Sequence, residues 1–292
     1  MSALLPPAVD AEGSPRASSA PTPGRAPLWL GTSWKMTKTL DESRAYVQDL
    51  VSTPFPAGVE VFLLPPLTAL HAVLDALPPR SPVRVGVQNA HSAPDGPVTG
   101  EVSMRQVRDA GAQLVEIGHS DRRSRFGETD EVVAAKVTAA LGQHLVPLVC
   151  VGEPASVRDA GRAEEHVADQ VRAALRGVAP ADVAQVLVAY EPVWAIGDSG
   201  RAATPDDVVG VLARIRAVVA GLGPDVRLRG LLYGGSVSPS NAAALLDLDD
   251  LDGLFVGRAA WTADGFAALL DICGRVAAER VHPSSPHEQR SR

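Results

Sequence analysis

Short apolar runs alternate with longer amphipathic stretches over most of the chain, and this alternation constrains the fold more than any other feature of the sequence. Short apolar runs are typical of strands buried on both faces, while the longer stretches have the period of a helix that packs on a core. The strand predictions are Leu28–Trp34, Val59–Leu64, Val83–Gln88, Leu114–Gly118, Val146–Val151, Val186–Tyr190, Leu228–Tyr233 and Gly253–Val256. Eight such runs, each followed by a helix-like stretch, predict a closed parallel (β/α)8 barrel of the α/β class.

The stretches between these runs predict helices of different strength. Thr204 before Pro205 is a typical helix start, because threonine caps the first turn and proline suits the first helical position. A weaker helix is expected near Pro239–Leu246. The strong predictions are Leu40–Val51, Thr129–Leu141, Ala163–Arg176, Pro205–Ala220 and Phe266–Ala278.

The two ends of the chain differ in composition from the alternating part. Residues 1–27 are dense in Pro, Ser, Ala and Gly, and the final segment VHPSSPHEQRSR has a similar composition. Such segments have little apolar surface to bury, so we predict disordered tails at 1–27 and 281–292. The residues between them, 28–280, form a single predicted domain of a length that suits one barrel.

Charge and cysteine usage exclude several classes of function. A formal net charge of -7 argues against nucleic acid or an anionic membrane as the main partner. Cys150 and Cys273 match no metal or redox spacing, and Cys150 lies in the apolar run LVPLVCV, which indicates a buried reduced thiol. No apolar run approaches the roughly 18 residues of a membrane span, and the N-terminus lacks a secretory signal, so a cytoplasmic location is expected.

Polar side chains directly follow three of the apolar runs, at the strand ends where a barrel of this type carries its chemistry. Lys35 follows the first run, His119 the fourth and Glu191 the sixth. Taken singly, each is most often a surface or capping group. The carboxyl ends of parallel strands share one face, however, so the three side chains are expected to converge there. A carboxylate such as Glu191, after a fully apolar run, needs a specific reason for its position.

Glycine turns follow the last two runs. The seventh ends in YGGSV, which includes Ser236, and the eighth ends in Gly257. Glycine lets backbone N–H groups approach an anion without obstruction, and a helix start behind the turn adds a favourable dipole. Phosphate sites in such barrels typically lie after these two strands, so the turns predict a phosphate-binding end.

Lysine is rare in this chain, which has three lysines against twenty-four arginines. Lys35 and Lys38 both fall in GTSWKMTKTL. An ammonium is a compact charge on a flexible stem, whereas a guanidinium is broad and planar, so Lys35 is interpreted as a contact to a small anionic substrate and Lys38 as a surface residue. The arginines Arg122, Arg123 and Arg125 are expected to form structural ion pairs near a helix start.

Five motifs together resemble those of triosephosphate isomerase. They are GTSWKM, GHSDRRSRFGETD, YEPVWAIG, YGGSV and DGLFVG, in this order, and the likeness runs from Leu28 to Ala278. The resemblance implies a TIM barrel and an isomerase that moves a carbonyl by enediol proton transfer, without cofactor or metal. It also implies a homodimer, in which the loop around Thr99-Gly100-Glu101 reaches the partner near Lys35.

The resemblance also implies a role for each matching residue. Glu191 would be the base, His119 the neutral electrophile, and Lys35 the cation that holds the substrate and stabilises developing negative charge. The segment Trp194–Thr204 would close as a lid. The residues implied to bind phosphate are Gly197, Ser236, Gly257 and Arg258.

Three departures from the family pattern fall around the substrate pocket. Ser33 stands where the family has Asn, the lid GDSGRAAT reads one residue longer, and Gly257-Arg258 replaces Gly-Gly. They leave the base and electrophile unchanged, which favours altered specificity, with room for one more hydroxymethyl group. The departures resemble the branch that converts L-erythrulose 1-phosphate to D-erythrulose 4-phosphate in erythritol breakdown.

Two alternatives remain open at the level of the sequence. A pocket discriminates by only about 1–3 kcal/mol per methylene-sized group, so triosephosphate isomerase proper, acting on glyceraldehyde 3-phosphate in glycolysis, stays a close second. A non-catalytic phosphate-binding barrel is a remote third, because a binding protein has no need of Lys35, His119 and Glu191 together.

Overall fold

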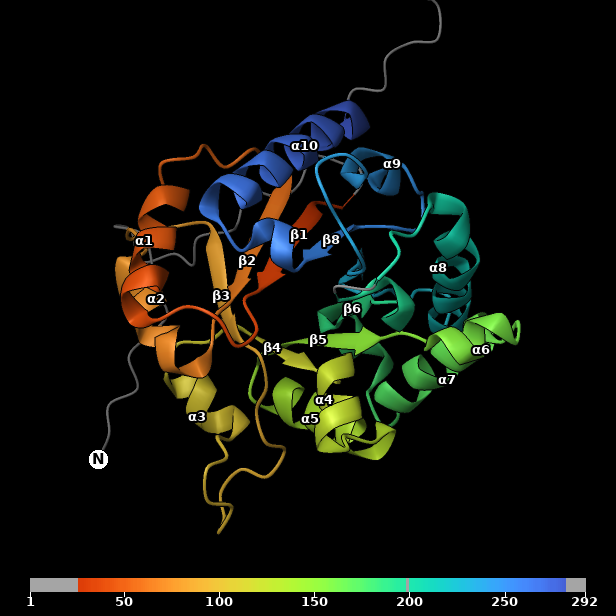
Figure 1. The fold of residues 1–292 in the computed structure, drawn as a ribbon. Coiled ribbons are helices and arrows are strands. Elements are labelled where there is room, and N and C mark those ends of the chain that lie inside the picture. The colour runs from red at the N-terminus through yellow and green to blue at the C-terminus, as the bar shows by residue number, and fades with distance from the viewer. Residues whose placement is uncertain (1–25, 198–199, 282–292) are drawn as a thin grey trace, which may run out of the picture.

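In the computed structural model, which describes residues 26–197 and 200–281, eight parallel strands close into one barrel with the helices arranged around it (Figure 1). Each strand pairs with the next along the chain, and β1 pairs with β8 to complete the ring. The predicted (β/α)8 barrel is therefore confirmed. The strands are β1 (Leu28–Ser33), β2 (Val59–Leu64), β3 (Val83–Val87), β4 (Leu114–Ile117), β5 (Val146–Val151), β6 (Leu187–Tyr190), β7 (Gly230–Tyr233) and β8 (Gly253–Val256).

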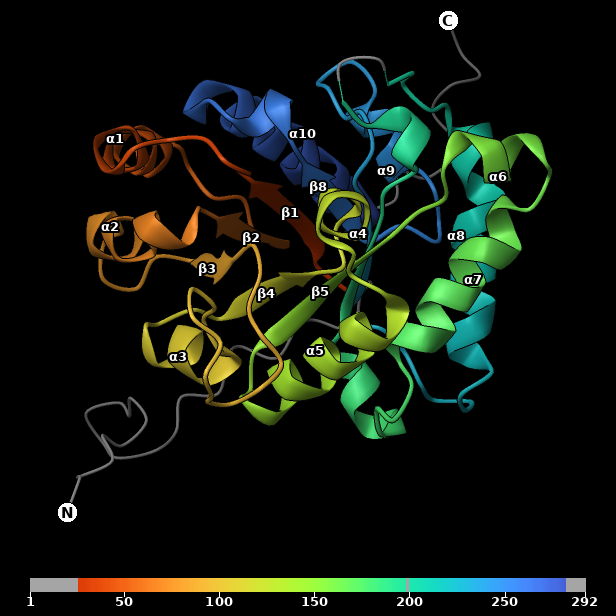
Figure 2. The same cartoon turned by 60° about the horizontal axis from the view of Figure 1, so that its bottom comes forward.

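The helices form the outer layer, which surrounds the strands in both views (Figure 2). The α-helices are α1 (Leu40–Leu50), α2 (Leu70–Ala76), α3 (Met104–Asp109), α4 (Ser120–Phe126), α5 (Asp130–Gly142), α6 (Ala155–Asp159), α7 (Ala163–Ala174), α8 (Pro205–Ala220), α9 (Ala242–Leu246) and α10 (Ala263–Val281). Short 3₁₀ turns are η1 (Leu67–Ala69), η2 (Pro180–Gln185), η3 (Val193–Ala195) and η4 (Arg258–Ala260).

The long helices match their predictions, and α8 begins as predicted. Thr204 caps α8 in a reciprocal arrangement with Asp207, and Pro205 occupies its first turn. Four helices without a prediction, α2, α3, α4 and α6, have only five to seven residues each. Helices this short do not show a full amphipathic period, so the sequence pattern misses them.

Alternation along each strand divides the core in two. Outward side chains such as Leu30 and Val115 pack against the helices, while inward ones such as Trp29 and Leu114 fill the barrel. The ring of Phe62 stacks on Phe255 inside the barrel, with centroids 5.8 Å apart. A Cβ at Gly31 would lie 1.9 Å from the Phe62 ring, so the chain needs glycine there for the ring to fit.

Some expectations about the ends of the chain fall outside the described residues. The predicted tails lie there, apart from Ala26 and Pro27, which precede β1, and Val281, which ends α10. Helix α10 thus reaches one residue into the segment predicted as a tail. Within 26–197 and 200–281, no helix has the length and apolarity to span a membrane. Cys150 is a buried free thiol, as predicted, and Cys273 is buried and free as well.

Candidate active site

The predicted site residues line one cavity of about 580 Å³ at the carboxyl ends of the strands. The side chains predicted for chemistry, from Lys35, His119 and Glu191, come from the ends of β1, β4 and β6. The structure therefore brings together residues that are far apart in the sequence, the most distant pair being Ser33 and Arg258, which are 225 positions apart. The full predicted set on this cavity is Ser33, Lys35, His119, Glu191, Gly197, Ser236, Gly257 and Arg258.

His119 is a buried imidazole whose orientation is fixed by the start of α4. The backbone N–H of Asp121 donates to Nδ1 of His119 over 2.9 Å. An imidazole nitrogen that accepts a hydrogen bond carries no proton, so in the neutral ring the proton resides on Nε2. Nε2 faces the cavity side, 3.8 Å from Oε2 of Glu191. The ring is thus placed to donate a hydrogen bond toward whatever lies between these two groups.

Glu191 is a buried carboxylate with 5% of the residue exposed. Its backbone N–H donates to the carbonyl of Val151 over 2.7 Å, which joins the end of β6 to β5. A Cβ at Gly152 would lie 1.9 Å from the Glu191 carbonyl oxygen, and one at Gly234 would lie 2.7 Å from its Cγ, so glycines make the room. Among the described residues, Oε2 of Glu191 has no hydrogen-bond partner. A buried carboxylate oxygen left in this way points to a functional role.

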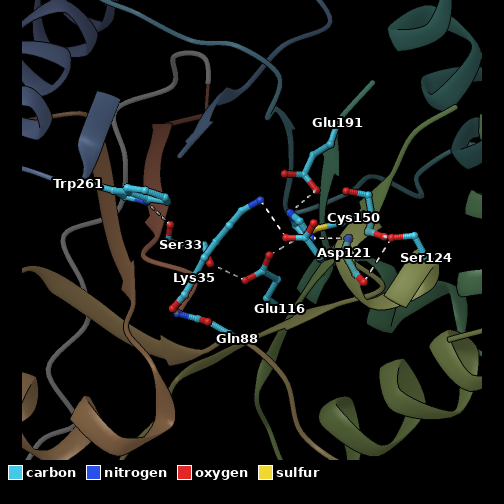
Figure 3. A network of polar contacts seen from close by, with 11 residues as sticks. Ser33, Lys35, Gln88, Glu116, Asp121, Ser124, Cys150, Glu191 and Trp261 are labelled. Carbon is cyan, nitrogen blue, oxygen red and sulfur yellow. Dashed lines mark hydrogen bonds and ion pairs between the residues drawn. The ribbon is translucent and has the colours of Figure 1, made fainter. Parts of the chain in front are cut away.

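Lys35 lies in a strained backbone conformation, with φ at 51° in the left-handed region. Gln88 supports this turn, because its Nε2 donates to the Lys35 carbonyl over 2.9 Å. The Lys35 ammonium is 3.1 Å from Oδ2 of Asp121, which ties β1 to the loop that carries His119 (Figure 3). Strain that is held by surrounding contacts is typical of functional positions.

Lys38 is not the plain surface residue that the sequence predicted. Its ammonium donates to the carbonyl of Trp261 over 2.6 Å and lies 5.3 Å from the centroid of the Trp34 ring. Partial burial lowers the pKa of Lys38, against the opposing effect of Glu42. The hydrogen bond to Trp261, at the end of η4, and the contact with the Trp34 ring hold this side chain against the protein.

Glycine turns and a hydroxyl form the end of the cavity opposite the strand β4. The carbonyl of Ser236 accepts from Asn241 Nδ2 over 2.9 Å, which anchors the turn after β7. The Arg258 guanidinium donates to the carbonyl of Gly197 over 2.8 Å. Arg258 therefore points toward the first residues of the predicted lid. Asp198 and Ser199, within that segment, lie outside the described residues.

The arginines after β4 have two different roles. Arg122 pairs with Glu128, and Arg123 pairs with Asp130 over 2.6 Å, as the structural interpretation predicted. Glu128 also pairs with the buried Lys136, the third lysine of the chain. Arg125, by contrast, lines the cavity that His119 also lines, and its predicted structural ion pair stays a prediction.

Sequence reasoning missed Glu116, a buried acid beside the site. It lies on β4 with 2% of the residue exposed, and its Oε2 accepts a hydrogen bond from the Ser33 hydroxyl over 2.9 Å. The signal was present in the run LVEIG, where a charged residue interrupts a predicted strand two positions after the inward-facing Leu114. Trp261 was also missed as a support, and its Nε1 donates to the Ser33 carbonyl over 2.9 Å.

Burial controls the electrostatics of this part of the barrel. It raises the pKa of Glu116 to about 7, with Glu191 acting in the same direction and His119, Ser33 and Lys35 opposing it. Burial, together with the carboxylates of Glu191 and Glu116, also holds the pKa of the Cys150 thiol well above its ordinary value. No group of three or more His, Cys, Asp or Glu side chains in the described ranges is arranged to hold a metal ion.

Comparison with known proteins places the chain in a family. The family described as triosephosphate isomerase matches residues 28–273. The L-erythrulose-1-phosphate isomerase of Mycolicibacterium smegmatis is 49% identical over 254 residues, which cover 85% of this chain and 94% of that protein. The enzymes of the same name from Mesorhizobium japonicum and Brucella abortus biovar 1 are 45% and 42% identical, over 87% and 84% of this chain and 99% and 96% of theirs. The chain therefore belongs to the triosephosphate isomerase family of enzymes.

Proposed function

We propose that this enzyme converts L-erythrulose 1-phosphate to D-erythrulose 4-phosphate by proton transfer through an enediol. Two relatives that share 49% and 45% of their residues with the chain carry the name L-erythrulose-1-phosphate isomerase. The observation that carries the reaction type is the buried Glu191 carboxylate, whose Oε2 faces Nε2 of His119 at 3.8 Å. A base and a hydrogen-bond donor at this separation can act on two neighbouring carbons and their oxygens.

Glu191 is the base in this proposal. The carboxylate removes the proton from C3 of L-erythrulose 1-phosphate, and the C–H electron pair forms a C2–C3 double bond as the C2 carbonyl becomes an oxyanion. The same carboxyl group then returns the proton to C2, the hydroxyl on C3 loses its proton, and the carbonyl re-forms at C3. The product is D-erythrulose 4-phosphate once the carbons are numbered from the other end. A positioned base contributes about 10²–10⁴-fold to such a step.

His119 and Lys35 stabilise the charge that develops on the two oxygens. The Asp121 N–H occupies Nδ1, so the His119 ring donates from Nε2 as a neutral group and can pass a proton between the oxygens. The Lys35 ammonium supplies a fixed positive charge near the same oxygens, held by Asp121. Preoriented donors in a buried site stabilise a transition state more strongly than water does.

The phosphate lies in this proposal at the glycine turns. Ser236 and Gly257 line that end of the cavity, and Gly197 and Arg258, joined by a hydrogen bond, lie at its rim. Closure of the segment Trp194–Thr204 would exclude water and protect the enediol from loss of phosphate. Trp194 anchors the start of this segment, because its Nε1 donates to Glu153 over 2.6 Å.

A homodimer and a cytoplasmic location complete the proposal. The exposed apolar side chains of Met36 and Phe126 line a second cavity that also includes Gly100 and Glu101 of the predicted interface loop. Exposed apolar groups around one hollow are typical of protein interfaces. Sedimentation of the purified protein is expected to give twice the mass of one chain, and a monomer at assay concentration would contradict the dimer.

The substrate is tested by a direct comparison. Purified protein is assayed on L-erythrulose 1-phosphate and on glyceraldehyde 3-phosphate in parallel, and kcat/KM is expected to be higher on the tetrulose phosphate. Because the family is named for triosephosphate isomerase, the triose phosphate is the informative competitor. A much higher kcat/KM on glyceraldehyde 3-phosphate would overturn the proposed substrate while leaving the reaction type in place.

A further inference from the structure

Glu116 has no part in the proton transfer described above, although it is a buried acid beside the site. Strand β4 alternates, so Leu114 and Glu116 both point into the barrel while Val115 and Ile117 point out to the helices. Leu114 belongs to the apolar cluster inside the barrel, but Glu116 contacts the Ser33 hydroxyl at 2.9 Å (Figure 3). Burial of an ionisable group costs free energy, so its presence one layer above an apolar residue calls for a function.

The position of Glu116 relative to the cavities gives the first argument. A second cavity, of about 770 Å³, adjoins the first and is lined by Glu116. Ser33, Lys35 and His119 line both cavities. The glycine turns at Ser236 and Gly257 line only the first. Lys35 and His119 therefore lie between a phosphate end and an end that contains Glu116.

The structure of the substrate gives the second argument. In L-erythrulose 1-phosphate the reacting carbons are C2 and C3, the phosphate is on C1, and C4 is the carbon of the terminal hydroxymethyl group. A triose phosphate has no carbon beyond its reacting pair on the side away from the phosphate. With the phosphate at the glycine turns and C2 and C3 at Lys35 and His119, the C4 group extends toward Ser33 and Glu116.

We infer that the Ser33–Glu116 pair binds the terminal hydroxymethyl group of a four-carbon sugar phosphate and is a specificity-determining element of the site. This inference rests on the proposed function. The Ser33 hydroxyl already donates to Oε2 of Glu116, so its lone pairs can accept from the substrate hydroxyl. The other carboxyl oxygen, Oε1, has a long contact of 4.0 Å to the Cys150 thiol, which leaves it with hydrogen-bonding capacity.

The protonation of Glu116 fits this role. Burial raises its pKa to about 7, and the nearby Glu191 carboxylate acts in the same direction. His119, the Ser33 hydroxyl and Lys35 also face it and all three lower the pKa, and the Cys150 thiol lies against its other oxygen. A carboxyl group that is neutral in part of the population near pH 7 can donate as well as accept. It therefore adds a hydrogen-bonding group without a second full negative charge beside the base.

The test compares two variants on two substrates. Glu116→Leu replaces the carboxyl by an apolar group, and Glu116→Gln keeps its size and a hydrogen-bonding end. We expect the ratio of kcat/KM on L-erythrulose 1-phosphate to kcat/KM on glyceraldehyde 3-phosphate to fall by roughly 10–100-fold in the Leu variant, chiefly through KM, and to stay within roughly 3-fold in the Gln variant. An equal loss on both substrates, an unchanged ratio in the Leu variant, or a loss in the Gln variant as large as in the Leu variant would overturn the inference.

A matched ligand separates the effect of a hydrogen bond to the terminal hydroxyl from the effect of room for the fourth carbon. The probe is 4-deoxy-L-erythrulose 1-phosphate, which lacks only the terminal hydroxyl. Wild-type enzyme is expected to use it roughly 10–100-fold less efficiently than L-erythrulose 1-phosphate, and the Leu variant is expected to treat the two alike. An equal penalty in both proteins would overturn the inference. The proposed function is judged by the wild-type ratio alone, so the two ideas fail separately.

Discussion

The lower and upper parts of the barrel interior are built by the same strands but from opposite kinds of residue. Trp29 and Phe62 pack against each other in the lower part with ring centroids 6.2 Å apart, and Phe62 stacks at 5.8 Å on Phe255, which lines the cavity above. Higher in the barrel, Ser33 and Glu116 form a buried polar pair. Two positions along one strand, from Leu114 to Glu116, separate an apolar side chain of the lower part from a polar one of the upper part.

The difference shows how one barrel separates stability from chemistry. Apolar surface buried in the lower part stabilises the fold by about 25 cal/mol per Å². The upper part buries Glu191 with an oxygen that has no hydrogen-bond partner among the described residues, which costs stability instead. Changes in the upper part should therefore alter activity, and changes in the lower part should alter unfolding.

The largest effect is expected from Glu191→Gln in the upper part. The amide cannot remove a proton from carbon, so kcat should fall by about 10²–10⁴-fold. The midpoint temperature of thermal unfolding should be unchanged or slightly higher, because the variant removes a buried charge. Binding of a phosphorylated ligand, measured by calorimetry, is expected to persist. Turnover within a factor of a few of wild type would show that another group is the base.

In the lower part, Phe62→Ala should act on stability. The ring is fully buried and its loss leaves a cavity, because Gly31 beside it has no side chain to fill the space. The free energy of unfolding, from denaturant titration, should fall by about 3–5 kcal/mol. The kcat/KM of the protein that remains folded should change much less. A loss of activity as large as that of Glu191→Gln would contradict the separation of the two parts.

The pH dependence of the free energy of unfolding tests whether burial of Glu116 in the upper part destabilises the fold. The pKa of Glu116 is raised from 4.5 to about 7 in the folded protein, so the folded state binds more protons than the unfolded state between these values. The stability due to this group is therefore complete below pH 4.5 and is lost as the pH rises through 7. Between pH 4.5 and 8, the free energy of unfolding of the wild type should fall by up to about 3 kcal/mol more than that of Glu116→Gln. Denaturant titrations of both proteins across this range measure the difference, and parallel curves would refute it.

The smallest effect is expected at the rim, from Arg258→Ala. The variant removes the hydrogen bond from the guanidinium to the Gly197 carbonyl, which is exposed. One such bond contributes about 0.5–1.5 kcal/mol, so KM should rise by roughly 2–10-fold with kcat nearly constant. Arg44→Ala, which breaks an exposed ion pair with Asp41, is a matched control and should leave KM unchanged. An equal KM in the two variants would show that Arg258 does not contribute to substrate binding.

The fold could be predicted from the sequence because its signal is repeated eight times. The sequence pattern located each strand to within two residues. The ends of β1, β4 and β6 then indicated Lys35, His119 and Glu191. The rule that loops after the strands carry the chemistry depends only on chain direction. For these residues, local sequence and three-dimensional position give the same information.

Contacts between distant segments could not be predicted in this way. The pairing of Ser33 with Glu116 depends on two strands that are not neighbours in the barrel, β1 and β4. The role of Lys38 depends on Trp261, which is 223 positions away. The local pattern places Glu116 inside the barrel but does not indicate which distant residue it contacts, because that contact follows from how the closed ring brings the strands together.

Trp261 has a consequence for how the protein becomes active during synthesis. Its indole N–H and its carbonyl bridge the first β/α connection to the last, through Ser33 and Lys38, and the Tyr46 hydroxyl adds a third link to Ala260. The substrate pocket thus straddles the seam where the two ends of the polypeptide meet. A nascent chain that still lacks β8 contains Lys35, His119 and Glu191 but not Gly257, Arg258 and Trp261, so the pocket is complete only after the last strand and the turn behind it have been synthesised.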